Sequence, residues 1–131
     1  MNLSEAQARG YSADALAFYG DSVYEELVRR YLVLQANQPA AKLHEKKIEL
    51  VCAEFQAQGY DKILLHLTET ELGVMKRDRN AAVHVPRHTA AMTYHKVTGC
   101  EALFGYLALI GAEQRLEELF HILLTGFFSN L

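Results

Sequence analysis

The sequence predicts an all-α fold, and two observations support this prediction. No stretch shows the sustained alternation of apolar and polar residues that marks a half-buried strand. The two prolines, Pro39 and Pro86, fall between segments in which apolar residues recur at helical spacing. At 131 residues the chain fits a single domain, residues 1–131, that can bury roughly two thirds of its unfolded surface without disulfides.

The first half of the chain predicts two helices. One is expected over about 13–35, where two i,i+4 glutamate–arginine pairs support the exposed face. Its expected apolar stripe consists of Leu16, Gly20, Val23, Leu27, Tyr31 and Leu34. A second helix is expected over about 41–58, after Pro39, and Gly59 is expected to end it.

The second half predicts three more helices. Thr68 and Glu71 have the spacing of a capping box, which indicates the start of a helix. A longer helix is expected over about 89–110, and residues 80–88 before it are expected to form an exposed loop. A final amphipathic helix is indicated by apolar residues three and four positions apart, namely Leu116, Leu119, Phe120, Leu123 and Leu124.

The net charge of −3 argues against a nucleic-acid partner, but the charge is unevenly distributed. Residues 76–88, which we call the basic segment, contain Lys76, Arg77, Arg79 and Arg87 against Asp78 alone, a local charge of +3 that leaves −6 for the rest. A basic loop held between helices suits a polyanion. Alternatively, the basic segment is a solvated helix end whose cations complement the helix dipole.

The remaining composition narrows the class of protein. Cys52 and Cys100 each lie in a helical segment and no secretory signal is recognisable, so a reduced, cytoplasmic protein is expected. No uncharged run is long enough to span a bilayer, so no membrane segment is expected. The six histidines match no spacing typical of zinc ligands.

Two carboxylates, Asp21 and Glu101, stand alone in otherwise uncharged apolar helical stretches. An unpaired charge on a helix face that packs against a core is costly to desolvate, so it normally has a cation or a raised pKa. Both acids have small neighbours in the sequence, such as Gly20 beside Asp21. Small residues allow two helices to cross closely, and a crossing at these points would bring both carboxylates to one divalent cation. Alternatively, both are ordinary helix acids, with Asp21 as a cap and Glu101 turned to solvent.

Three motifs resemble the ribonuclease III family. The segment Leu16-Ala-Phe-Tyr-Gly-Asp-Ser-Val-Tyr-Glu25 resembles its signature, and Glu101-Ala-Leu-Phe-Gly-Tyr-Leu107 resembles its second acidic motif. Between them, Met75-Lys-Arg-Asp-Arg-Asn-Ala81 is similar to an element of the mini-ribonuclease III subgroup. The resemblance covers about residues 13–127, which is the length of the nuclease domain without a double-stranded-RNA-binding domain.

The resemblance implies a Mg²⁺-dependent endoribonuclease that cleaves double-stranded RNA and leaves 5′-phosphate products. It implies an all-α, ribonuclease III-type domain that forms a homodimer, and for this subgroup a role in the maturation of large-subunit (23S) ribosomal RNA. Asp21 and Glu101 match the family's catalytic, metal-binding carboxylates. Ala17 and Thr98 stand where full-length members have two further acids, so the number of metal ions stays open.

Several residues are expected to contact RNA, because A-form RNA is bound largely through phosphates and 2′-hydroxyls. They are Lys76, Arg77, Arg79, Asn80, His84, Arg87, His88 and Lys96. Two alternatives remain. A non-catalytic all-α RNA-binding dimer would keep the basic segment and lack cleavage, and a helical interaction module would use neither the acids nor the basic segment.

Overall fold

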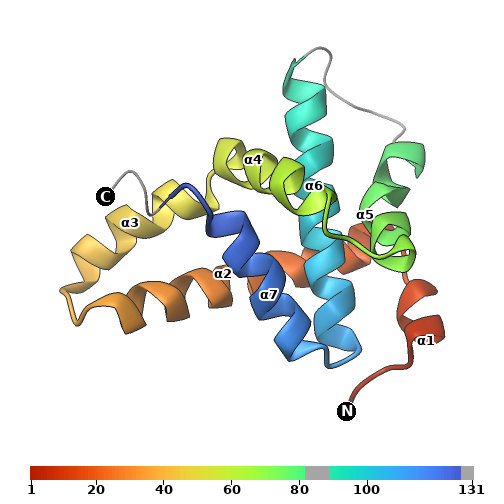
Figure 1. Ribbon diagram of the computed structural model, residues 1–131, viewed down its shortest axis with the longest axis horizontal. Coiled ribbons are helices and arrows are strands. Elements are labelled where there is room, and N and C mark those ends of the chain that lie inside the picture. Colours follow the sequence, from red (N-terminus) through yellow and green to blue (C-terminus); the bar gives the residue numbers. More distant parts are fainter. Residues whose placement is uncertain (82–88, 128–131) are drawn as a thin grey trace.

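The computed structural model describes residues 1–81 and 89–127, and within these ranges it is helical and has no strand, as predicted. The helices are α1 (Glu5–Arg9), α2 (Ala13–Gln35), α3 (Ala40–Val51), α4 (Ala53–Leu64), α5 (Glu69–Ala81), α6 (Thr89–Leu109) and α7 (Glu113–Leu124). Figure 1 shows α6 running through the middle of the molecule, where it packs against α2, α4, α5 and α7. The chain is therefore organised around α6.

Helix α2 has the predicted bounds, but its buried face differs from the predicted stripe. Ser12 caps its start, since the Ser12 hydroxyl accepts a hydrogen bond from the backbone N–H of Ala15. The buried residues are Ala13, Leu16, Ala17, Gly20, Tyr24, Val28 and Leu32. Leu34 is 69% exposed, and the other expected members after Gly20 are only half-buried. The prediction chose the buried face from the positions of apolar residues, whereas the face that is buried in the structure is the one that contacts α6.

The predicted helix over 41–58 is wrong, because the chain breaks at Cys52 into α3 and α4. Cys52 has an extended backbone, with φ −66° and ψ 154°. The break leaves the carbonyl of Leu50 free to accept a buried hydrogen bond of 2.5 Å from the Tyr24 hydroxyl. Gly59 does not end the helix: it lies within α4, where an added Cβ would be 2.4 Å from the Leu123 side chain.

The later helices follow the prediction more closely. The capping box at Thr68 is confirmed, since Thr68 and Glu71 each donate a backbone N–H to the other's side chain. α6 and α7 lie where expected, and all five predicted apolar residues of α7 are buried. α5 continues through Ala81, so Asn80 belongs to the helix rather than to the loop. The short helix α1 was not predicted.

The backbones of α2 and α6 lie very close together where these two helices cross. A Cβ added to Gly20 would lie 1.6 Å from the carbonyl oxygen of Glu101, and one added to Gly105 would lie 2.1 Å from the carbonyl oxygen of Leu16. Only glycine leaves room for backbones at this separation. The expected crossing at these small residues is therefore confirmed.

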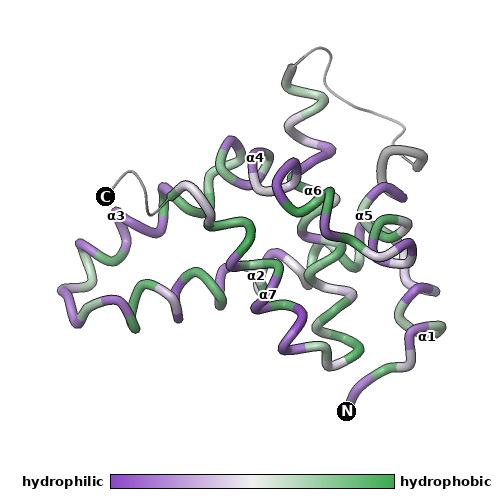
Figure 2. The backbone as a smooth tube through the Cα atoms, viewed as in Figure 1, coloured by the Kyte–Doolittle hydropathy of each residue, from purple (hydrophilic) through white to green (hydrophobic). Residues whose placement is uncertain are grey.

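Figure 2 shows that the second half of α6 is mostly hydrophobic, whereas the first half of α6 and α3 mix hydrophobic and hydrophilic residues. The buried core includes Phe104, Leu103 and Leu107 of α6 together with Leu119 and Leu123 of α7. Among residues 1–81 and 89–127, no helix combines the length and the apolar character needed to cross a membrane.

A side chain at Gly20 should push α2 and α6 apart. We expect Gly20→Ala to destabilise the protein by about 3 kcal/mol, the upper part of the usual range for overpacking. Gly73→Ala is the matched control, because an added Cβ there meets nothing within 4 Å. In α5 this change should gain up to about 1 kcal/mol through helix propensity. Urea unfolding measures both, and equal effects would contradict the close crossing.

Candidate active site

The crossing of α2 and α6 places Asp21 beside Glu101. Asp21 follows Gly20, the residue whose Cα faces the Glu101 carbonyl, and its side chain is exposed, whereas Glu101 is half-buried. In its protonated form the Glu101 carboxyl donates a hydrogen bond to the Asp21 carboxylate. The two acids, eighty positions apart in the sequence, therefore form one pair.

Burial raises the pKa of Glu101 to about 8, and the hydrogen bond to Asp21 and the negative charge of Asp21 act in the same direction. The same surroundings raise the pKa of two neighbours, Tyr24 and Cys100, mainly because both are buried and partly because Glu101 is close. No cation of the described residues forms a salt bridge with either Asp21 or Glu101. The pair thus carries an electrostatic cost that no salt bridge within residues 1–81 and 89–127 removes.

A divalent cation fits this arrangement, because it would attract both carboxylates and allow Glu101 to lose its proton. The described residues contain no group of three or more His, Cys, Asp or Glu side chains placed to hold a metal ion. Ala17 and Thr98, at the positions one turn before Asp21 and Glu101, are both nearly buried and neutral. An ion here would have two protein ligands, Asp21 and Glu101, a number that suits Mg²⁺ when a phosphate completes its coordination.

Two of the cations expected to contact RNA are already engaged by protein groups. Arg77 donates from Nη1 to the carbonyl oxygen of Arg9 at 2.7 Å and from Nη2 to that of Tyr11 at 2.8 Å, so it ties α5 to the end of α1. Lys96 pairs with Asp61, its Nζ lying 2.9 Å from Oδ1. Both residues therefore have structural partners, and their expected contacts with RNA stay predictions. Sequence reasoning missed these partners because they lie 66 to 68 and 35 positions away.

The other expected RNA contacts remain predictions. Lys76 is exposed on α5. Arg79 and Asn80 belong to the last turns of the same helix. His84, Arg87 and His88 lie outside the described residues.

Comparison with known proteins identifies the family. The profile of the Ribonuclease III domain matches residues 14–111. A mini-ribonuclease 3 of Thermosynechococcus vestitus is 42% identical over 109 residues, which are 83% of this chain and 71% of that protein. A mini-ribonuclease 3 of Staphylococcus aureus is 36% identical over 113 residues, 84% of each chain. The crystal structure of a Fusobacterium nucleatum protein, 30% identical, has a TM-score of 0.79 and covers 95% of this chain and 100% of its own.

The chain therefore belongs to the ribonuclease III family, a family of endoribonucleases. Within that family it groups with the mini-ribonucleases, which match it along most of its length. The class of fold and the class of enzyme predicted from the motifs are confirmed.

The raised pKa of Glu101 predicts a pH-dependent stability. Between the ordinary value of 4.5 and about 8 the folded state holds a proton that the unfolded state releases, so stability should fall as the pH rises through this window. Glu101→Gln cannot ionise. We expect it to match the wild type near pH 4.5 and to be more stable than the wild type above pH 8. Urea unfolding in chelator measures this difference.

The control for this measurement is Glu26→Gln, which removes an exposed acid from the same helix as Asp21. Its effect on stability should not change between the two pH values in the way that Glu101→Gln does. A Glu101→Gln effect that is the same at both pH values would show that Glu101 titrates as an ordinary surface acid.

Proposed function

We infer that this chain is a Mg²⁺-dependent endoribonuclease of double-stranded RNA, in which Asp21 and Glu101 hold the ion. The observation that carries the proposal is the pairing of the two carboxyl groups at the α2–α6 crossing, where the pKa of Glu101 is raised to about 8 and no cation of the described part of the chain forms a salt bridge with it. Perturbed acids that no structural partner satisfies are typical of functional sites.

The bound ion would stabilise negative charge on the phosphoryl oxygens and activate water for attack on phosphorus. The chain's own contribution is to position the ion. Exposed Asp21 keeps it at the surface, where a phosphodiester reaches it, and half-buried Glu101 fixes it from the side of the core. With two protein carboxylates, RNA and water supply most of the coordination, so metal affinity without RNA should be weak.

The RNA contacts proposed here are Lys76, Arg77, Arg79, Asn80, His84, Arg87, His88 and Lys96. Backbone contacts of this kind bind without reading sequence, and binding should weaken steeply as salt is added. Maturation of 23S ribosomal RNA follows from the resemblance to the mini-ribonuclease subgroup. The cytoplasm is the proposed compartment, and the two free cysteines, Cys52 and Cys100, support it.

A homodimer is the proposed assembly, with α2 at its interface. On α2, Phe18 is 86% exposed and Tyr19 is 42% exposed, which leaves large apolar surface next to Asp21. Tyr24 of the same helix is 2% exposed and belongs to the core, so it lies outside the proposed interface. A two-fold axis through this surface would present two carboxylate pairs to the two strands of a duplex.

Removing either carboxylate should abolish cleavage. With end-labelled double-stranded RNA in Mg²⁺, Asp21→Asn and Glu101→Gln should each reduce the cleavage rate by roughly two orders of magnitude or more, because each removes one of two protein ligands of the ion. Glu26→Gln, an exposed acid of the same helix, should cleave like the wild type. Circular dichroism checks that each variant is folded.

Cleavage that survives in either carboxylate variant would contradict the proposed site. RNA that is bound by the wild type but stays intact in Mg²⁺ would instead favour the alternative of a non-catalytic RNA-binding dimer. The absence of acids at Ala17 and Thr98 would then explain why the bound RNA is not cleaved.

The dimer is tested at Phe18. Phe18→Ala should shift the equilibrium from dimer to monomer in light scattering after size-exclusion chromatography, because it removes the largest exposed aromatic surface of α2. Leu65→Ala is the matched control, since Leu65 is 89% exposed at the end of α4 and lies outside the proposed interface. A wild type that is monomeric throughout, or a Phe18→Ala variant as dimeric as Leu65→Ala, would contradict this interface.

A further inference from the structure

The second region of concentrated positive charge lies on α2 and α3, far from the basic segment in the sequence. Residues 28–51, which we call the arm, contain Arg29, Arg30, Lys42, Lys46 and Lys47 against two acids, Glu45 and Glu49. The arm thus carries +3, as the basic segment does, in a chain whose net charge is −3. The proposed function gives these cations no role.

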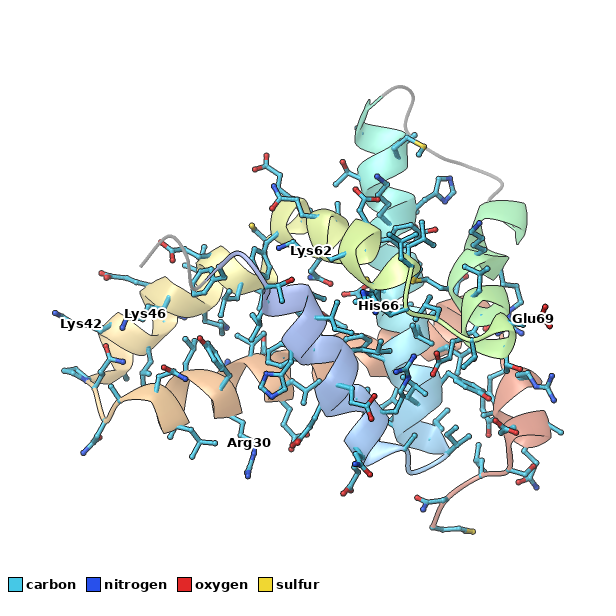
Figure 3. The ribbon with its side chains drawn as sticks, in the orientation of Figure 1. Arg30, Lys42, Lys46, Lys62, His66 and Glu69 are labelled. Atoms are coloured by element: carbon cyan, nitrogen blue, oxygen red, sulfur yellow. The ribbon has the colours of Figure 1, made fainter. Side chains whose placement is uncertain are left out.

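The arm is a hairpin that extends from the body of the molecule. Figure 1 shows the second half of α2 and the antiparallel α3 leaving the body together. At its base the Tyr24 hydroxyl donates to the Leu50 carbonyl, which anchors α3 to α2. Figure 3 shows Lys42 and Lys46 at the outer end of α3, and Arg30 pointing from α2 to the side away from α3. The cations of the arm therefore lie on two helices that are held together at their base.

Between the two helices of the arm lies a hollow of about 350 Å³. Its polar wall consists of Arg29, His44 and Lys47, and its apolar wall includes Leu32, Val33 and Leu43. No acid lines the hollow. Cations beside an apolar floor suit a sugar–phosphate backbone, which presents phosphate oxygens and the carbon face of a ribose together.

Glu25 moderates this charge. Its carboxylate lies 3.1 Å from Nε of Arg29 and 3.4 Å from Nζ of Lys47, so one acid serves two cations. The Arg29 side chain is nevertheless 61% exposed. Lys42, further out, is exposed and forms no salt bridge with a described residue. A net positive charge therefore remains for an external anion.

The beginning of α3 adds a further positive contribution. The N-cap of this helix is Pro39, which makes no side-chain capping hydrogen bond, and the first turn contains no acid. Its first residue, Ala40, lines the hollow. The positive dipole end of a 12-residue helix thus lies beside the cations and favours a phosphate there.

The arm is connected geometrically to the carboxylate pair. Asp21, Glu25 and Arg29 are spaced four residues apart, so they follow one flank of α2, and Arg29 lies about 12 Å from Asp21 along the helix axis. Arg30, nine residues after Asp21, is two and a half turns away and points to the opposite side. A strand that leaves Asp21 along this flank therefore reaches the hollow within a few nucleotides.

We propose that the arm is a second RNA-binding surface of the enzyme, on which Arg29, Lys42, Lys46 and Lys47 hold the sugar–phosphate backbone of RNA that flanks the cleaved bond. This inference rests on the proposed function, because it requires RNA at Asp21 and Glu101. The arm sets affinity for the duplex, whereas the carboxylates carry out the chemistry.

The test measures binding of fluorescein-labelled duplex RNA by anisotropy over a range of salt concentrations, in chelator so that no cleavage occurs. Lys42→Gln combined with Lys46→Gln should weaken binding several-fold and lower the slope of log affinity against log salt by about two. Arg29→Gln should lower it by about one. Arg30→Gln removes the same charge from the opposite side of α2 and should match the wild type.

A variant that removes a negative charge from the arm's base distinguishes RNA binding by the cations from a purely structural role. Glu25→Gln removes the acid that neutralises Arg29 and Lys47, so it should tighten RNA binding while it loses two ion pairs. If the cations only stabilise the arm, this variant would bind RNA no better than the wild type and would melt earlier. That result, or an Arg29→Gln slope equal to that of Arg30→Gln, would overturn the inference.

Cleavage in Mg²⁺, measured on the same proteins, distinguishes this inference from the proposed function. A wild type that binds duplex RNA through the arm and never cleaves it would refute the nuclease mechanism and leave the arm in place. A wild type that cleaves, with binding that is independent of the arm residues, would refute the arm alone.

Discussion

The backbone contact between α2 and α6 is the constraint on which the rest of this structure depends. Gly20 and Gly105 allow the two helices to approach until each glycine faces a carbonyl of the other helix. This contact buries the middle of α6, on which α4, α5 and α7 then pack. It also brings Asp21, the residue after Gly20, to Glu101, four residues before Gly105. The same contact therefore forms the core and the candidate site.

Two acids that are removed from solvent show how structural and functional carboxylates differ in this fold. Glu71 is buried, and Arg115 donates to both of its oxygens at 2.8 Å, so hydrogen bonds from Arg115 and Thr68 lower its pKa. Glu101 faces another acid, and its pKa is raised to about 8. Glu71 thus has a protein cation as its partner, whereas Glu101 has none among the described residues, which is why we propose an external cation for it.

A site of this kind costs stability, and the surrounding core offsets the cost. Tyr24 lies one turn beyond Gly20, packs its ring against Phe104 and Phe120, and fixes α3 through the Leu50 carbonyl. Such packing holds Asp21 and Glu101 together without a bound ion. The core thus holds the candidate site together, and the proposed ion would bind there with little rearrangement.

The sequence was sufficient for the fold class and most helix bounds, because these depend on local spacing, and short motifs pointed to the acid pair although its members lie eighty positions apart. It was not sufficient where distant residues decide. The Leu50 carbonyl before the break at Cys52 accepts from Tyr24, 26 positions earlier, and Gly59 packs against Leu123, 64 positions later. Arg77 and Lys96 look like free cations until the fold gives them carbonyls and Asp61 as partners. The cations of the arm can be counted in the sequence, but only the structure shows that α2 and α3 form a hairpin that brings them together.

The central claim is that Asp21 and Glu101 form a close pair that a divalent cation completes. The most direct measurement is the titration of the Glu101 carboxyl carbon by NMR of protein labelled in glutamate, with the Glu101→Gln variant to assign the signal. The account predicts a midpoint near 8 in chelator and a lower midpoint, by more than about one pH unit, in saturating Mg²⁺. A midpoint near 4.5 that Mg²⁺ does not move would contradict it.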